Sequence, residues 1–384
     1  MKTLLILLLL VPSLSLGLTF KSDGSIVDSK GNIIKTEKDL KIDNKKQNKI
    51  YFPFNSEYIK GVTNKQWEII SKIGDPLDCK KRIERIENSL PDIIISPEEF
   101  ENNPKIINDS LKENFVVKLK SGKYMLDNLI IVPKGKILLG EDYAEIISSN
   151  VYVTIANMGS ISNLKISNPK SNGVMLASNS DTHMVIVEKA GIDSKDNSSG
   201  NGISSRGKSS HDNCVVSVEA SFGYNEKGNS KVTEKGGNAD GFAVKQGAYN
   251  ITLIDTHAHH NSDDGFDFWK GGWNAEIKND SPTIRVFYSS ANHNGKNPYT
   301  QNGDGTGFKL GSSNEYQYPK EDKGARLIYG SVACFNKDIG FTRNKSPSLI
   351  FAYNLESKGN KKDYLKIGKI RNNDDDFILR CKMF

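Results

Sequence analysis

The sequence predicts an all-β fold, a right-handed parallel β-helix in which one chain winds into stacked coils, with an N-terminal extension that contains some helix. Short β-branched runs separated by Gly, Asn, Ser and Asp follow one another from residue 114 onward, and no helical period of useful length recurs there. Two short motifs also repeat in phase at variable spacing, which suits coils whose corners accept insertions rather than a sandwich with fixed strands.

The first repeated motif is a Gly followed by an apolar residue. Its six copies are at Gly173, Gly202, Gly241, Gly265, Gly307 and Gly340, so the successive steps are 29, 39, 24, 42 and 33 residues. The second motif ends in Asn after a strand-like run, and its copies are at Asn225, Asn261, Asn294 and Asn336. An Asn at one recurring corner predicts a ladder of side-chain amides between neighbouring coils.

The first 17 residues carry one charge, Lys2, followed by an apolar run and by small residues before Leu18. This pattern predicts a secretory signal peptide over residues 1–17, and therefore a secreted, extracellular protein. The apolar run is well short of the ~20 residues that span a bilayer, so we expect no membrane partner. Sequons for N-glycosylation fit secretion and are at Asn108, Asn197, Asn250 and Asn279.

Composition divides the rest of the chain into three parts. Residues 18–110 are predicted to be an extension that caps the open end of the coil stack, with a helix over residues 64–72 that Asn64 can cap. Residues 111–360 are predicted to form the β-helix, and residues 361–384 a tail that packs on it. We expect a monomer.

Charge and composition narrow the class of protein. With 384 residues, 36% apolar and 26% charged, the chain is long enough to bury a large core, and general disorder is not expected. The excess of 52 Lys and Arg over 46 Asp and Glu has no basic block, so it does not indicate nucleic acid but is compatible with an acidic substrate. Four separated cysteines without a Cys-x-x-Cys pair disfavour zinc and allow disulfides whose pairing stays open: Cys79, Cys214, Cys334 and Cys381.

Stacking the coils on the repeated Gly converts the sequence into a spatial map, because adjacent coils lie ~4.8 Å apart. Strand alternation then assigns each side chain to the core or to the outer face. The inward positions of three consecutive coils are Phe242, Phe266 and Phe308. The outward positions beside them are Ala243, Asp267 and Lys309.

Four carboxylates crowd together on this map: Asp240, Asp263, Asp264 and Asp267. Unpaired charges in such a group repel one another unless a cation or protons intervene. Calcium takes roughly six to eight oxygens in flexible geometry, so it fits such a set better than octahedral magnesium does. The sequence therefore predicts a calcium site. The alternative is that these Asp residues only form the local hydrogen bonds of turns.

Lys309 lies one coil beyond the predicted cation, in the segment GTGFKLG. A surface Lys is ordinarily solvated. A nearby divalent cation disfavours the ammonium form, however, and a neutral amine is a usable base near neutral or alkaline pH. A cation on a uronate carboxylate acidifies the proton α to it. The two roles together predict β-elimination in a uronic-acid polymer.

Four segments, NADGFAVK, HNSDDGFDFW, GFKLG and FNKDIGFTRN, resemble polysaccharide lyase family 9, the pectate lyases built on a right-handed β-helix. The resemblance covers roughly residues 115–355. It implies a calcium-dependent lyase that cleaves α-1,4-galacturonan by β-elimination, with Ca²⁺ on the four aspartates named above and Lys309 as the Brønsted base. Phe266 stands where the family pattern has Trp.

A second outward column, two residues further along, contains Arg206, Lys245 and Trp269. We expect these side chains to line a groove for an acidic polysaccharide, the alternative being that they are solubilising or cover a neighbouring coil. Lys270 and Arg343 are further candidates. A zinc site at His257, His259 and His260 is rejected, because strand alternation separates His260 from the other two and no local Cys or acid completes a tetrahedral set.

Other functions stay open on the same scaffold. One is a lyase for another uronic-acid polysaccharide, alginate or a glycosaminoglycan. Another is a non-catalytic pectin-binding β-helix in which calcium only joins coils. Hydrolysis is less favoured, because Lys309 occupies a coil position where a hydrolase would want an acid or its partner.

Overall fold

The computed structural model describes residues 19–20, 26–27, 33–35, 56, 58–191, 200–225, 237–269, 282–298, 303–311, 324–344, 346, 348–371 and 381. The chain divides into two units, Met1–Phe52 and Pro53–Phe384. The predicted signal peptide, residues 1–17, lies outside the described residues. No helix within the described ranges is long and apolar enough to cross a membrane.

The first unit contains one small antiparallel sheet in the order β1-β2-β3. Its strands are β1 (Thr19–Phe20), β2 (Ile26–Val27) and β3 (Ile33–Lys35).

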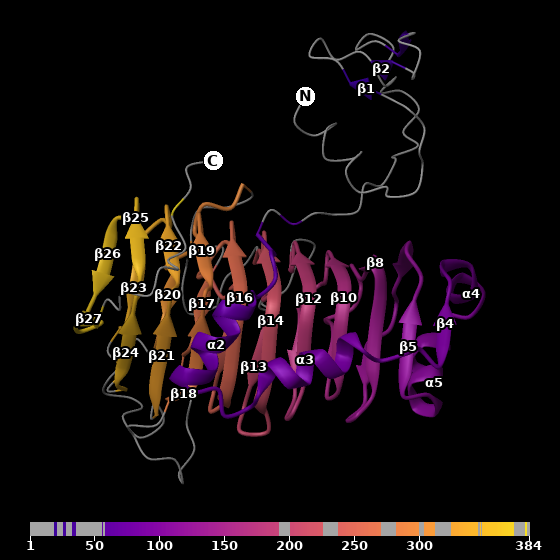
Figure 1. Cartoon of the computed structure of the whole chain (residues 1–384), viewed down its shortest axis with the longest axis horizontal. Coiled ribbons are helices and arrows are strands. Elements are labelled where there is room, and N and C mark those ends of the chain that lie inside the picture. Colours follow the sequence, from indigo (N-terminus) through magenta and orange to yellow (C-terminus); the bar gives the residue numbers. More distant parts are fainter. Residues whose placement is uncertain are drawn as a thin grey trace. The chain divides into compact units, whose positions relative to one another are not determined.

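The second unit is a parallel β-helix, as predicted: parallel strands from successive coils stack side by side along its length (Figure 1). Among the residues that the structure describes, the longer sheet has 15 strands, and its main path runs β27-β24-β21-β18-β16-β14-β12-β10-β8-β5-β4. Its strands are β4 (Ile93–Ile95), β5 (Val116–Leu119), β6 (Lys123–Met125), β8 (Ile137–Ile147), β10 (Ser160–Ser167), β12 (Asp181–Glu188), β14 (His211–Ser221), β16 (Tyr249–His259), β18 (Pro282–Phe287), β19 (Ser290–Asn292), β21 (Ala325–Tyr329), β22 (Val332–Cys334), β24 (Ile350–Tyr353), β25 (Glu356–Lys358) and β27 (Ile370–Arg371).

The other sheet of this unit has nine strands in the order β26-β23-β20-β17-β15-β13-β11-β9-β7. These strands are β7 (Ile130–Val132), β9 (Val153–Asn157), β11 (Asn172–Leu176), β13 (Ile203–Arg206), β15 (Phe242–Lys245), β17 (Phe266–Asp267), β20 (Phe308–Lys309), β23 (Ile339–Thr342) and β26 (Lys362–Leu365). This sheet carries the repeated Gly motif, and it positions the candidate site.

The core between the sheets is built from aligned side chains. Phe242, Phe266, Phe308 and Phe341 stack with ring centroids 4.8, 4.4 and 4.7 Å apart, and all four are buried. The predicted inward column is therefore confirmed. The repeated Gly is required by close packing, since a Cβ at Gly265 would lie 2.7 Å from the Gly307 carbonyl oxygen.

An amide ladder joins neighbouring coils at one corner, as predicted, but with a corrected register. The side-chain amides of Asn261, Asn294 and Asn336 each donate to the Oδ1 of the next Asn, ending at Asn360, at 3.0, 2.9 and 3.0 Å. The placement of Asn225 in this ladder was wrong. Ser221 pairs with His259, so Gly223 lies level with Asn261 and donates its backbone N–H to Asn261 Oδ1 at 2.9 Å. A Cβ at Gly223 would lie 2.9 Å from that oxygen, which explains the Gly.

Parallel pairing runs from β4 to β27, so the coil stack includes segments that the sequence analysis placed in the extension (18–110) and in the tail (361–384). The segment of β4 contains neither the Gly motif nor the Asn motif, and β26 follows the last copy of the Gly motif. The two motifs therefore could not assign these strands to the coil stack.

In the described residues, four helices precede most of the strands: α2 (Asn64–Ile73), α3 (Cys79–Glu87), α4 (Pro97–Asn102) and α5 (Ile106–Glu113). The predicted helix over residues 64–72 is α2, but Thr63 rather than Asn64 caps it, in a capping box with Gln66. Helices α2 and α3 lie across the outer face of the longer sheet, while α4 and α5 lie at the end of the stack beside β4 (Figure 1).

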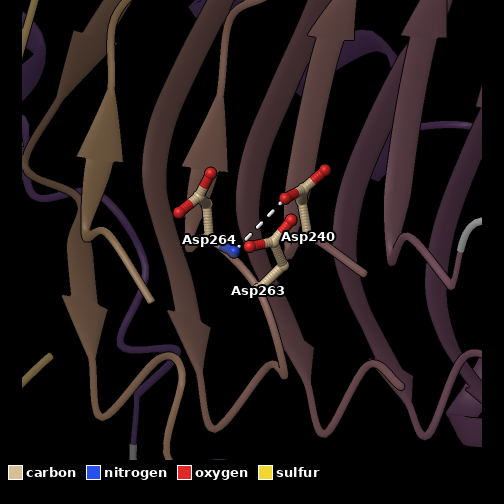
Figure 2. A group of neighbouring side chains, drawn as sticks. All are labelled: Asp240, Asp263 and Asp264. Atoms are coloured by element: carbon tan, nitrogen blue, oxygen red, sulfur yellow. Dashed lines mark hydrogen bonds between the residues drawn. The ribbon is translucent and has the colours of Figure 1, made fainter. Parts of the chain in front are cut away.

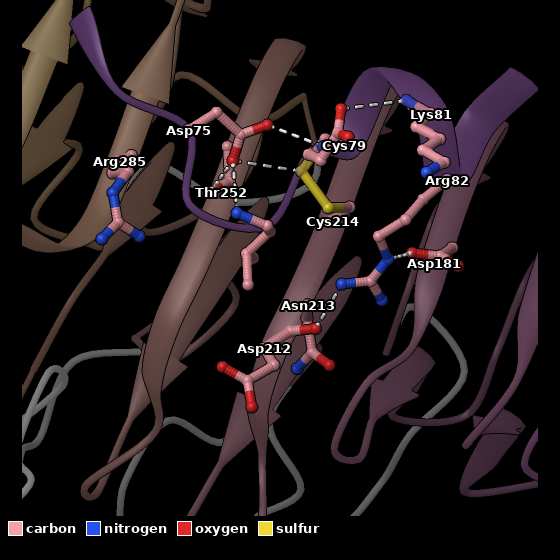
Figure 3. Close-up of a disulfide and its surroundings, with 12 residues drawn as sticks. Asp75, Cys79, Lys81, Arg82, Asp181, Asp212, Asn213, Cys214, Thr252 and Arg285 are labelled. Atoms are coloured by element: carbon pink, nitrogen blue, oxygen red, sulfur yellow. Dashed lines mark hydrogen bonds and ion pairs between the residues drawn. A yellow bond between two sulfur atoms is a disulfide. The ribbon is translucent and has the colours of Figure 1, made fainter. Parts of the chain in front are cut away.

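Two disulfides tie the edges of this unit. Cys79 in α3 is bonded to Cys214 in β14, and Cys334 in β22 is bonded to Cys381. The first bond holds α3 on the sheet together with an ion pair between Arg82 Nε and the buried Asp181 at 2.7 Å (Figure 3). These pairings settle what the cysteine count left open.

We predict that replacing both Cys79 and Cys214 by Ser lowers the free energy of unfolding by about 2–5 kcal/mol, because the bond closes a long loop in the unfolded chain. The two cysteines are 135 residues apart in sequence. Thermal denaturation under non-reducing conditions measures the change. The matched control is the Cys334→Ser, Cys381→Ser pair, which closes only 47 residues and should cost less. Equal melting temperatures for both variants and the parent chain would contradict the prediction.

Candidate active site

Three consecutive coils bring the candidate residues together on the outer face of the nine-stranded sheet. Phe242 pairs with Phe266 and Phe266 with Phe308, so Ala243, Asp267 and Lys309 lie side by side in one outward column. The register predicted from the repeated Gly is therefore the observed one. Alternation along each strand sends the phenylalanines into the core and these neighbours outward.

Three of the four predicted metal ligands form one compact group. Asp240, Asp263 and Asp264 each offer a carboxylate oxygen within 4.8 Å of the others, and all three are buried (Figure 2). Asp240 comes just before β15, and Asp263 and Asp264 just before β17. Asp267 is not part of this group, because it lies within β17 in the outward column.

Backbone N–H groups hold these carboxylates in place. The N–H of Asp264 donates to Asp240 Oδ1 at 3.3 Å, and the N–H of Thr306 donates to Asp264 Oδ1 at 2.8 Å. Asp263 accepts from the N–H of Asn238 at 2.7 Å and from that of Asp304 at 2.9 Å. The turn hydrogen bonds of the alternative interpretation are thus present. The Oδ2 atoms of Asp240 and Asp264 instead accept hydrogen bonds from Lys245 and Lys309, respectively.

Lys309 lies where the acidic group meets the outward column. Its Nζ is 2.9 Å from Asp264 Oδ2 and 3.5 Å from Asp304 Oδ2. Asp304, for which the sequence predicts no role, is 61% exposed. The amine is therefore held between a buried carboxylate and an exposed one.

Lys245 differs from its expected position in the groove. Its side chain is 5% exposed, and its Nζ is 2.7 Å from Asp240 Oδ2 and 2.6 Å from Asp267 Oδ2. A buried ammonium needs paired charges, and two aspartates supply them here. In the sequence, only the short separation of five residues between Asp240 and Lys245 could have indicated this ion pair.

The other two residues of that column have the expected register. Arg206 pairs with Lys245, and the Trp269 carbonyl accepts from the N–H of Gln246 at 3.2 Å, which places Trp269 level with Lys245. Both Arg206 and Trp269 are partly exposed. Arg343 is also partly exposed, and Lys270 lies outside the described residues.

Burial and mutual repulsion shift the pKa values of the acidic group. Burial and the charge of Asp240 raise the pKa of Asp263 to about 7. Burial also raises the pKa of Asp264 well above its usual range, although Lys309 opposes the shift. Burial would raise the pKa of Asp267, but Lys245 and Lys309 outweigh it and lower that pKa. The group therefore favours added protons or a bound cation.

The donor set fits a hard divalent cation. It consists of carboxylate oxygens, the ligands that calcium prefers, on two adjacent coils. Asp267 lies beside Lys309 in the outward column, and its buried Oδ1 has no hydrogen-bond partner among the described residues. No other group of His, Cys, Asp and Glu in the described part of the chain has metal-ligand geometry.

The three histidines form no metal site in the described residues. His257 lies between Asp255 and Ser290 at 2.8 and 2.9 Å, and His259 Nε2 is 3.1 Å from Glu219. His260 stacks on Phe222 with ring centroids 5.2 Å apart. These side chains therefore hydrogen-bond or stack with their neighbours within the coils, and two of them contact carboxylates, Asp255 and Glu219.

Comparisons with known proteins agree with the fold. A family model described as "Pel9A-like, right handed beta helix region" matches residues 134–373. "Pectate lyase L" of Paenibacillus polymyxa is 33% identical over 131 residues, which are 33% of this chain and 27% of that protein. "Pectate lyase L" of Thermoclostridium stercorarium is 37% identical over 131 residues, 32% of this chain and 10% of that protein. The chain thus spans about a quarter or less of the length of these curated relatives.

The fold is also similar to that of a solved pectate lyase. The crystal structure of pectate lyase Pel9A superposes with a TM-score of 0.53 at 19% sequence identity, over 74% of this chain and 73% of that one. The family model covers more than half of the 384 residues and agrees with the resemblance seen in the sequence. The chain therefore belongs to the family of Pel9A-like proteins with a right-handed β-helix.

Proposed function

We propose that this protein is a calcium-dependent pectate lyase that cleaves α-1,4-galacturonan by β-elimination. The observation that carries the proposal is the buried group of Asp240, Asp263 and Asp264 with the Lys309 amine 2.9 Å from Asp264. A lyase needs no attacking water and no pair of carboxyl groups across the bond at hydrolase spacing. The names of the similar proteins support the same reaction class.

The mechanism assigns one role to the acidic group and one to the lysine. Asp240, Asp263 and Asp264 would hold Ca²⁺, with Asp267 beside them. When bound, the cation supplies positive charge that pairs with the uronate carboxylate and acidifies the proton at C5. Lys309 Nζ accepts that proton. The electron pair left at C5 forms the C4–C5 double bond as the bond from C4 to the glycosidic oxygen breaks, and the leaving oxygen is then protonated.

Positioning of the base follows from its neighbours. The contact with Asp264 keeps Nζ beside the acidic group, and the exposed Asp304 lies on the other side. Lys245 neutralises part of the negative charge on Asp240 and Asp267 without being exposed to a substrate. We therefore assign Lys245 to the support of the acidic group, and Arg206 and Trp269 to contacts with the acidic polysaccharide.

We predict that activity rises with pH between 6 and 10. Burial alone would lower the pKa of Lys309, but Asp264, Asp267 and Asp263 outweigh it and raise that pKa well above its ordinary value. A cation on the aspartates opposes this shift, yet the reactive amine is still the deprotonated form, whose share grows with pH. Initial rates at saturating calcium measure the profile, and a flat profile would contradict the role of Lys309.

The proposal extends to cellular location and assembly. We propose a secreted, extracellular monomer with a signal peptide at residues 1–17, acting on pectate without a nucleic-acid or membrane partner. Of the four sequons, Asn108 and Asn250 lie in the described residues and hydrogen-bond through their side chains to Leu129 and Asp212. Glycosylation at either would break that contact, and the other two sequons lie outside the described residues.

The test of the proposal is a panel of acidic polysaccharides incubated with the protein and calcium. Polygalacturonate should yield products with the ultraviolet absorbance of an unsaturated uronate. The same product from alginate or a glycosaminoglycan alone would favour the other lyase function. Reducing ends without that absorbance would indicate a hydrolase, and binding without turnover would indicate a non-catalytic pectin-binding protein.

A further inference from the structure

The outer face that carries Lys309 continues across the neighbouring coils toward β7. The outward column runs from Lys309 through Asp267, Ala243 and Ser204 to Met175, Ala156 and Ile131. Its character changes along the way. Met175 and Ile131 are 36% and 43% exposed, so the outer face is apolar and exposed from the coil of Met175 onward, which is two coils from Asp240 and three from Asp263 and Asp264.

Tyr152 and Asp263 occupy equivalent positions in two different coils. Tyr152 lies beside the apolar part of the outer face, and Asp263 lies beside Lys309. Val153 pairs with Asn172. Backbone hydrogen bonds between the following coils align Asn172 with Asn201, Asp240 and Asp264. Tyr152 and Asp263 each come one residue earlier. The Tyr152 ring is 51% exposed, and Lys170 Nζ lies 4.5 Å from its centroid.

We propose that Tyr152, Lys170 and Met175 form a distal subsite for the uronate chain whose cleavage is proposed above, so this inference rests on that function. An amphipathic aromatic ring and a thioether offer apolar contact to the face of a sugar ring. The Lys170 ammonium, held over the Tyr152 ring, offers a charge partner for a uronate carboxylate. The face therefore offers an apolar surface for the sugar ring and a positive charge for its carboxylate.

The distance between the two sites sets the substrate length that can use both. Tyr152 and Asp263 are four coil steps apart, which is about 19 Å at the spacing of adjacent strands. A trisaccharide bound at the acidic group is too short to reach Tyr152, whereas a chain several sugars longer spans both. The subsite consequently affects long substrates and leaves short ones unchanged.

The experiment compares Tyr152→Ala and Lys170→Met with the parent chain on trigalacturonate and on long oligogalacturonates. We expect kcat/KM for the long substrates to fall about 3- to 10-fold, mainly through KM, with no change for trigalacturonate. The matched control is Lys136→Met. Lys136 Nζ lies 4.6 Å over the Phe115 ring, the same kind of pair, on segments that lead into the other sheet.

Equal loss on short and long substrates, or no loss on either, would overturn the subsite while leaving the lyase function intact. A parent chain that cleaves none of these substrates would instead refute the proposed function. The subsite is then decided by titration calorimetry with the long oligogalacturonate. Weaker binding by Tyr152→Ala and Lys170→Met than by Lys136→Met supports it, and equal binding overturns it.

Discussion

Replacement of Lys309 by Arg is expected to lower the rate of formation of unsaturated product by about 10²- to 10⁴-fold, the usual contribution of a positioned general base. Arg keeps the positive charge beside Asp264, but its guanidinium does not deprotonate in a protein, so it cannot accept the C5 proton. Ultraviolet absorbance of the product measures the rate. Lys309→Ala should cause a loss at least as large.

The Arg variant separates catalysis from stability. Lys309→Ala leaves the buried Asp264 without its ion pair, which destabilises the site in its own right. Thermal denaturation and calcium titration of Lys309→Arg should match the parent chain. Lys361→Ala is the control, since that lysine makes an exposed ion pair with Asp338 at 3.8 Å, away from the acidic group. Full activity in Lys309→Arg would refute the assignment of the base.

Removal of calcium is expected to abolish lyase activity, and added calcium, but not magnesium, should restore it. The acidic group places oxygens on two adjacent coils without imposing an octahedron, which suits calcium. Loss of an outer-shell partner lowers metal affinity about 10- to 100-fold. Asp263→Asn removes a direct ligand, so it should weaken calcium binding by at least as much. Titration calorimetry and melting temperature with and without calcium measure this.

Two comparisons make the calcium result decisive. Asp338→Asn changes a partly exposed carboxylate outside the acidic group and should leave calcium affinity unchanged. In the Lys309→Arg variant, calcium should still raise the melting temperature although product forms far more slowly, because the cation binds the folded chain. Undiminished activity in the presence of a chelator would contradict calcium dependence.

The register of the site was predictable because the repeated Gly is a steric requirement of stacked coils. A Cβ at Gly241 would lie 2.8 Å from the Gly265 carbonyl oxygen, so each copy marks the same level of the stack. Alternation along the strands did the rest and placed Lys309 beside Asp267. The Asn motif was less reliable, because at Gly223 the backbone N–H takes the place of the side-chain amide.

The sequence by itself determined the parallel β-helix, the inward column of phenylalanines and the proximity of Asp240, Asp263 and Asp264 to Lys309. All of these depend on the register between coils, and the repeated Gly marks that register in each coil. Only the tertiary structure decided that Lys245 is buried between Asp240 and Asp267, that Asp304 contacts Lys309, and which cysteines pair. Those contacts depend on where a flexible side chain or a loop comes to lie between coils, and no repeat in the sequence encodes that.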